Sequence, residues 1–379
     1  KPGEAPNVRI EASLPGRTRL LADGRLELGA AARFRGRIDA ATADARRLRD
    51  WLGDLVPPGA RAPVAALSVK AAAEISGVSL SLREAEMKLD RTPLKGDVIY
   101  FAPVAGERGR LFADLTSDAL DIDGAPDLTA LVGVAPDHDF SLTLDARAVR
   151  VARFGDGALD AGRIRLAARR EGGHAELERL SLERLGGANL TAQGALDAEG
   201  GRFTLDLDAE RLGDLAGLIE RLAPGRLSAA LKARAARLSP AKLTLSAEAG
   251  PDMALRAAAA TGVFAGTRAS AQAQAEAGGL AAHLEIAQDD VVALLRQIGL
   301  DTRAPPRLGP AKLVADVASQ PGGMATARAR FDAPGAKLVY EGGFQGAALL
   351  AGALQALGAL SLDAENVAPL LVAAGVLAP

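Results

Sequence analysis

Residues 200–222, GGRFTLDLDAERLGDLAGLIERL, contain the two patterns that decide the fold. Apolar and polar side chains alternate from Phe203 to Asp208, which is the period of a strand with one apolar face and one solvated face. From Leu215 to Leu222 the apolar residues instead recur at i, i+3, i+4 and i+7, the pattern of a short amphipathic helix. This stretch therefore predicts a strand that leads into a helix.

The helical pattern occurs five times, and the first residues of successive copies lie 76 to 87 residues apart. The copies are Leu48, Trp51, Leu52 and Leu55; Leu128, Leu131, Val132 and Ala135; Leu215, Leu218, Ile219 and Leu222; Val291, Leu294, Leu295 and Ile298; and Val367, Leu370, Leu371 and Ala374. The predicted N-caps or first-turn acids are Asp44, Asp127, Asp214, Asp289 and Asn366. A near-constant spacing of this kind indicates an internal repeat.

Between the predicted helices the sequence has the period of strands. Further alternating runs are centred on Leu80, Leu142, Leu243 and Leu284, and Gly-Gly turns such as Gly172-Gly173 separate them. We predict a mainly β fold, an extended curved antiparallel sheet of repeating β-groove modules with short amphipathic helices at the module junctions. The predicted modules are 1–58 (partial), 59–136, 137–224, 225–300 and 301–379.

An antiparallel sheet with one apolar face has to cover that face. One helix of about 15 Å is too short to cover several strands, so two arrangements stay open: a closed sandwich or barrel, and a trough completed by an apolar ligand. Each buried methylene of an acyl chain contributes roughly 0.8 kcal/mol, which favours a trough if the ligand is a lipid. The predicted lining is Val78, Leu80, Leu82, Leu142, Leu144, Leu205, Leu207, Leu243, Leu245, Leu284 and Ile286.

Two stretches of the chain resemble the AsmA-like family, which includes the TamB relatives. One runs from Leu67 to Leu131 and contains ISGVSLSLREAEMKLDRTPLKGDVIYF followed by GRLFADLTSDALDIDGAPDLTAL. The other runs from Phe140 to Leu222, with the order strand, Gly-Gly turn, strand, strand, helix. The stretch from Ala311 to Gly375 repeats this order more loosely. The resemblance implies β-groove modules in the periplasm, an inner-membrane anchor upstream of this chain, and a role in moving phospholipid toward the outer membrane or in outer-membrane assembly. It carries over no catalytic residue.

Composition excludes several functions. The chain has 45 basic and 47 acidic residues and no basic block, which argues against nucleic-acid binding. It has no Cys, and the three His have no metal-ligand spacing, so we predict no metal or cofactor and a surface or turn role for each His. The acidic run from Asp118 to Asp127 lacks the EF-hand register and is interpreted as a solvated turn. Trp51, the sole Trp, is predicted to be a core anchor.

Two other functions compete with lipid binding. The repeats could be closed sandwiches that serve as a scaffold or assembly factor for outer-membrane proteins and bind partners by strand addition. An enzyme acting on envelope polysaccharide would need paired carboxylates in a cleft, and the sequence offers no distinctive pair, so we expect no catalytic activity. The charged residues around Arg163 and Arg165, and around Glu176 and Glu178, are predicted to form cross-strand ion pairs on the solvated face.

Overall fold

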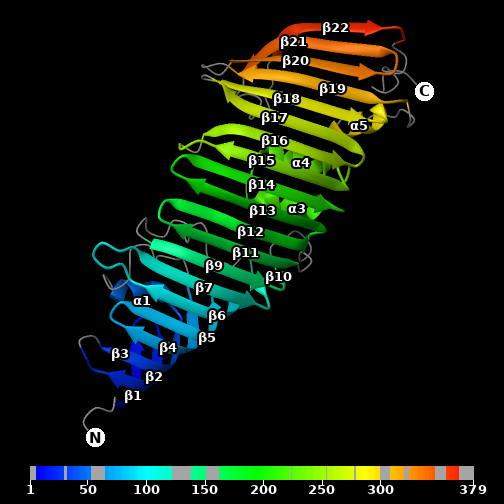
Figure 1. Cartoon of the computed structure of the whole chain (residues 1–379). Coiled ribbons are helices and arrows are strands. Elements are labelled where there is room, and N and C mark those ends of the chain that lie inside the picture. The colour runs from blue at the N-terminus through cyan, green and yellow to red at the C-terminus, as the bar shows by residue number, and fades with distance from the viewer. Residues whose placement is uncertain are drawn as a thin grey trace. The chain divides into compact units, whose positions relative to one another are not determined.

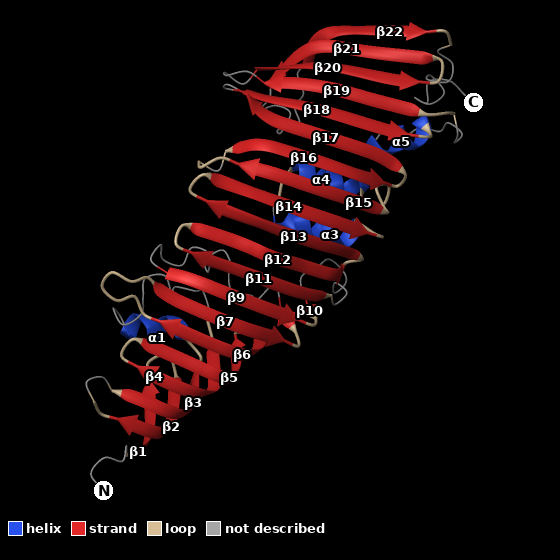
Figure 2. Ribbon diagram, viewed as in Figure 1, coloured by secondary structure: helices blue, strands red, loops and turns tan. Residues whose placement is uncertain are grey.

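The computed structural model describes residues 6–29, 32–52, 65–121, 138–150, 162–222, 224–252, 254–276, 279–298, 308–319, 324–345 and 356–366. The chain divides into two compact units, an N-terminal unit of residues 1–183 and a C-terminal unit of residues 184–379. Both are built mainly from strands, and the helices are short (Figures 1 and 2). The mainly β prediction is confirmed. The boundary between the units falls inside the predicted module 137–224, and the five-module division stays a prediction.

In the N-terminal unit, each strand from β1 to β7 pairs antiparallel with the next strand in sequence. The strands are β1 (Asn7–Leu14), β2 (Thr18–Glu27), β3 (Arg33–Thr42), β4 (Leu67–Ser76), β5 (Ser79–Leu89), β6 (Thr92–Phe101), β7 (Gly109–Ser117), β9 (His138–Ala146), β11 (Arg163–Glu171) and β12 (His174–Leu185). Two short strands, β8 (Leu120–Asp121) and β10 (Val149–Arg150), pair with each other. Helix α1 (Ala45–Leu52) follows β3.

The expectation of purely antiparallel pairing is wrong at two pairs, β7–β9 and the short pair β8–β10. Strands β7 and β9 are parallel, with Gly109 opposite His138 and Ser117 opposite Ala146. A parallel pair requires the chain to return to the starting end of the first strand, and residues 122–137, which make this connection, lie outside the described residues. Beyond β9 the sheet is antiparallel again, through β11 to β12.

In the C-terminal unit, every pair of neighbouring strands is antiparallel. The strands are β13 (Ala188–Asp197), β14 (Gly200–Ala209), β15 (Ala241–Ala249), β16 (Leu255–Phe264), β17 (Thr267–Glu276), β18 (Gly279–Gln288), β19 (Ala311–Ser319), β20 (Met324–Ala333), β21 (Ala336–Gln345) and β22 (Ala356–Ala364). Helices α3 (Gly213–Leu222) and α4 (Arg226–Arg234) connect β14 to β15, and α5 (Val291–Ile298) connects β18 to β19. Figure 2 shows these helices together on one face of the strands.

Three of the five predicted helices are confirmed as α1, α3 and α5, and the other two lie outside the described residues. Asp44 caps α1, because its Oδ1 accepts a hydrogen bond from the Arg47 amide at 3.1 Å. Asp214 lies in the first turn of α3, as predicted. The cap of α5 is Asp290 rather than Asp289, with its carboxylate accepting from the Val292 amide at 3.1 Å. Helix α4 was not predicted.

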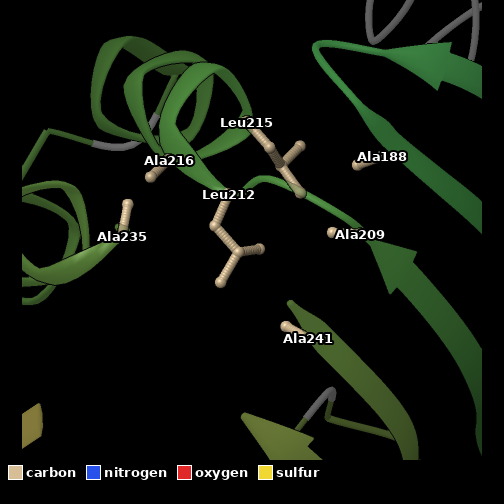
Figure 3. Close-up of a cluster of buried hydrophobic side chains, with 7 residues drawn as sticks. All are labelled: Ala188, Ala209, Leu212, Leu215, Ala216, Ala235 and Ala241. Carbon is tan, nitrogen blue, oxygen red and sulfur yellow. The ribbon is translucent and has the colours of Figure 1, made fainter. Parts of the chain in front are cut away.

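Small residues at the ends of the strands let the helices pack closely on the sheet. Leu212, Leu215 and Ala216 of the α3 segment are buried against the strand-end alanines of β13, β14 and β15, which are Ala188, Ala209 and Ala241 (Figure 3). Alanine in a strand places only a methyl group under the helix, so the helix backbone can approach the sheet. Helix α5 repeats the arrangement over Ala311 of β19, with Ile286 and Phe331 packed alongside.

The buried stripe of each helix differs from the predicted one. In each of α3 and α5 the residue that follows the first predicted apolar position is buried. These residues are Ala216 in α3 and Val292 in α5, whereas Ile219 and Ile298, which belong to the predicted stripes, are exposed. The core-anchor prediction for Trp51 is wrong, since the side chain is 56% exposed. No residue of α1 is buried, because charged residues occupy half of this eight-residue helix and leave too narrow an apolar stripe.

We expect the helix cores to stabilise their own strands. Leu294→Ala in α5 removes a buried side chain and should lower the free energy of unfolding by about 2–5 kcal/mol. The matched change Ile298→Ala, in the same helix at an exposed position, should cost less than about 0.5 kcal/mol. Urea unfolding, with hydrogen exchange of β18 and β19, measures both. Equal losses for the two variants would contradict this assignment of the core.

Candidate functional site

The candidate site is the apolar face of the sheet in each unit, defined by strand positions that share a side with Leu205 in the C-terminal unit and with Leu144 in the N-terminal unit. In the C-terminal unit Leu205 lies opposite Leu245, and Leu207 opposite Leu243. The cross-strand row through Leu205 consists of Ala192, Leu205, Leu245, Ala260, Ala271, Leu284, Ala315, Ala329, Tyr340 and Leu360. Ile286 lies in the neighbouring row. The register thus brings the six predicted C-terminal lining residues onto one face.

The N-terminal unit has the same organisation. Leu142 and Leu144 of β9 lie opposite Ala113 and Leu115 of β7, and continue across β6 to β5. Leu80 and Leu82 of β5 lie on this face, opposite Ile75 and Ala73 of β4. Val78 has the right parity but lies in the turn before β5, where its side chain is exposed.

An irregularity in β5 explains why the alternation slips between Leu82 and Met87. The register shifts between Leu82 and Ala85, so that two residues of β5 face no partner on β6. Glu84 in this bulge has a φ of 51°, and its amide donates to Asp97 Oδ1 at 2.8 Å. A β-bulge of this kind bends the strand and restores the apolar face after one extra residue.

The apolar face is covered unequally. In the N-terminal unit Leu82 is 8% exposed and packs with Ala71, Ala73 and Ala85. In the C-terminal unit the helices cover only the ends of the strands, and Phe203 at 37% and Leu245 at 36% remain exposed farther along. No second sheet packs on these rows among the described residues. The middle of this face is therefore apolar and accessible.

Cross-strand ion pairs occupy the opposite, polar face, as predicted, but several partners differ from those expected. Arg163 pairs with Asp145 and Arg165 with Glu183, whereas Glu176 and Glu178 both pair with a third arginine, Arg169. The partners differ because of the strand register. Arg165 of β11 lies opposite Asp145 of β9 and opposite Ser181 of β12, so Glu176 is too far along β12 to pair with it. Exposed pairs of this kind contribute little to stability, because water and salt screen them.

A hollow of about 1110 Å³ lies on the polar face of the C-terminal unit. Its floor is formed by small side chains such as Ala257, Ala259 and Ala281, and charged residues stand around it. The wall includes the ion pairs Arg202–Glu248 at 2.8 Å, Arg328–Glu341 at 2.9 Å and His283–Asp316 at 2.7 Å. Each arginine of this wall thus already has a carboxylate partner, and we place the candidate site on the apolar face.

The sequence-based prediction for one histidine is wrong. His138, expected at the surface, is 7% exposed and lies on the apolar face of β9 in the same alternation as Phe140 and Leu142. The alternation of apolar residues in β9, continued from Phe140 back to residue 138, would have placed His138 on the apolar face. His174 and His283 have exposed side chains, which confirms their predicted surface positions. Among the described residues no group of three His, Asp or Glu could share a metal ion.

Asp139 of β9, beside His138, connects this strand to Arg108, just before β7, and to Gly172, in the turn between β11 and β12. Its Oδ1 accepts from Arg108 Nε at 2.6 Å and from the Gly172 amide at 2.9 Å. Burial by itself raises the pKa of Asp139, but these hydrogen bonds and the charges of Arg108 and Arg110 together bring the pKa below its usual value. The hydrogen bond from Arg163 likewise lowers the pKa of Asp145 against the opposing effect of desolvation.

Because the pKa of Asp139 is lower in the folded than in the unfolded chain, its ionised form stabilises the fold. This contribution is complete above the unfolded value of about 3.9 and is lost as the pH falls through the lower folded value. We expect Asp139→Asn to cost on the order of 1–2 kcal/mol at pH 7 and to cost progressively less below pH ~4. Urea unfolding from pH 7 to pH 2 measures this.

The matched control is Asp23→Asn, an exposed carboxyl on the polar face of β2. Its effect on the free energy of unfolding should be small throughout the same pH range. A cost for Asp139→Asn that does not shrink at low pH would show that the carboxylate charge is not what stabilises this part of the sheet.

No helix among the described residues is long and apolar enough to span a bilayer. The uncharged stretch from Gly342 to Leu362 contributes instead to strands β21 and β22, with residues 346–355 outside the described part. Comparison of the chain with known protein families, with curated proteins and with solved structures finds no match. The likeness to the AsmA-like family therefore stays a prediction that rests on the sequence patterns.

Proposed function

We propose that the chain binds the acyl chains of phospholipids along its apolar face and conducts them between the inner and outer membranes. The observation that supports this proposal is the uncovered apolar row through Leu205. It crosses every strand of the C-terminal unit, and its side chains range from partly buried to exposed, with Leu245 at 36% and Leu360 at 66%. A soluble protein rarely leaves so extended an apolar surface without a ligand or partner.

The dimensions of this row suit an acyl chain. It crosses nine gaps between neighbouring strands, each about 4.8 Å, which gives roughly 43 Å within one unit. An acyl chain that moves along such a row exchanges one set of apolar contacts for another and does not enter water. Since each exposed methylene would cost roughly 0.8 kcal/mol, a continuous row lowers the barrier to movement at every step.

The register favours an open groove over a closed sandwich. A sandwich buries one face of each sheet against another sheet about 10 Å away, and among the described residues only the helices pack on the C-terminal apolar face. We propose a periplasmic, non-catalytic protein held to the inner membrane through a segment outside this chain, in keeping with the resemblance to the AsmA-like family.

A second function, as a scaffold in outer-membrane assembly, is favoured by one observation. Strand β22 pairs with β21 on one side, and no other described strand pairs with it. Its exposed residues include Leu357 at one face and Leu360 and Leu362 at the other. An edge strand of this kind is a template for strand addition by an envelope protein.

Lipid binding is tested by native mass spectrometry of the purified chain together with uptake of a fluorescent phospholipid. Leu205→Asp places a charge on the apolar face and should reduce uptake, because a carboxylate beside an acyl chain would have to lose its water. Thr204→Asp introduces the same charge one residue away, on the polar face, and should leave uptake unchanged. Leu245→Asp and Ser246→Asp form a second matched pair.

Circular dichroism and urea unfolding establish that each variant is folded before its uptake is compared. Equal uptake by Leu205→Asp and Thr204→Asp would exclude this face as the acyl-chain site. A folded wild-type chain that neither contains lipid nor takes it up would reject the transport proposal and favour the scaffold.

A further inference from the structure

Polar groups on the apolar face of the N-terminal unit gather at one place. Among the described strand positions that share this face, Arg170 is the one charged residue, and the other titratable residues are Tyr100 and His138. They lie on β6, β9 and β11, toward the ends of the strands opposite α1. A cation on an apolar face costs free energy unless a partner compensates for it.

The register places the three residues close together. Tyr100, Leu111, Phe140 and Arg170 form one cross-strand row. His138 lies two residues before Phe140 on the same strand and the same face, which makes it a diagonal neighbour of Arg170. Cα atoms in such positions are about 7–8 Å apart, a distance that an arginine side chain spans.

His138 is fixed in place. Its ring stacks on that of Tyr100, with centroids 5.9 Å apart and planes 12° apart, and its Nε2 lies 3.2 Å from the Tyr100 hydroxyl. It also lies over Gly109, where a Cβ would come within 2.3 Å of the imidazole. The buried Nδ1 has no hydrogen-bond partner among the described residues. Burial raises the pKa of Tyr100, which favours the neutral hydroxyl.

Arg170 differs from the neighbouring arginines in having no partner within the described part of the chain. Arg169, the preceding residue, points to the polar face and pairs with Glu176 at 2.6 Å and Glu178 at 3.2 Å. Arg108 pairs with Asp139 at 2.6 Å. Arg170 makes no hydrogen bond or ion pair with any residue that the structure describes. A planar guanidinium left free in this way is suited to bind a phosphate through two parallel hydrogen bonds.

We propose that Arg170, together with His138 and Tyr100, binds the phosphate of a lipid headgroup while the acyl chains lie on the neighbouring apolar rows. This inference rests on the proposed function and specifies its ligand as a phosphate-bearing lipid. On this face Phe140 and Leu142 are partly exposed, whereas Leu144 and Ala146, farther along β9, are buried. The headgroup is thus held at this end of the strands, and the acyl chains lie across the strands along the rows through Phe140 and Leu142.

The test compares phosphatidic acid with diacylglycerol of the same acyl chains, binding to the full chain. The wild-type chain should bind phosphatidic acid more tightly. Arg170→Gln should weaken phosphatidic acid binding on the order of ten- to a hundredfold, the range for losing charge-assisted hydrogen bonds, and leave diacylglycerol binding unchanged. Arg169→Gln removes the same charge from the polar face and should change neither affinity. Tyr100→Phe retains the ring stack and should cause a smaller loss.

The outcomes separate this inference from the proposed function. Equal binding of the two lipids by the wild-type chain, or equal effects of Arg170→Gln and Arg169→Gln, would overturn the headgroup site and leave acyl-chain binding in place. If neither lipid binds, the proposed function itself fails. Inorganic phosphate titrated alone should bind far more weakly than phosphatidic acid. Equal affinity would show that the site binds free phosphate rather than the headgroup of a lipid.

Discussion

Cross-strand hydrogen bonding in a fixed register places Leu205 opposite Leu245 and Leu207 opposite Leu243, and the same alignment continues from strand to strand through the C-terminal unit. Because side chains alternate between faces, a slip of one residue at any pair would move apolar side chains into the polar face and charges onto the apolar one. The ion pairs on the other face, such as Arg202–Glu248 and Lys312–Glu285, oppose such a slip. The apolar face, the helix cores and the candidate site all depend on this register.

The two units use the same pattern with different degrees of cover. Around Leu82 and Leu144 in the N-terminal unit the apolar face is buried, whereas in the C-terminal unit the buried residues of this face lie at strand ends, such as Ala209 and Ala241 beside α3 and Ala325 at the start of β20. Alanines such as Ala209 and Ala241 let α3 settle on those ends, and similar short helices could not extend over the whole length of the strands. An uncovered apolar row between buried ends is what an acyl-chain site requires, since the buried ends stabilise the sheet while the middle remains free for ligand.

One departure from regular antiparallel pairing, the parallel pair β7–β9, lies at the proposed headgroup site. The parallel pair β7–β9 sets His138 over Gly109 and beside Tyr100, an arrangement that a simple hairpin between these strands would not give. Arg108, Asp139 and the Gly172 amide connect the neighbouring strand ends and hold this corner of the sheet. Irregular geometry that is well supported by hydrogen bonds is often found at functional sites.

The sequence by itself determined the strands, their apolar faces and three helices, because periods of two and of 3.6 residues are local properties of the chain. Its alternation placed ten of the proposed lining residues, including Leu142 and Leu284, at strand positions that share an apolar face, and it located the slip in β5. That these residues line a lipid groove stays a prediction. Four features depended on the tertiary structure: the parallel pairing of β7 and β9, the exposure of Trp51, the burial of Ala216 and Val292, and the stacking of His138 on Tyr100. Each of these depends on which strands become neighbours, and neighbours are chosen by packing between residues far apart in sequence, which no local period encodes.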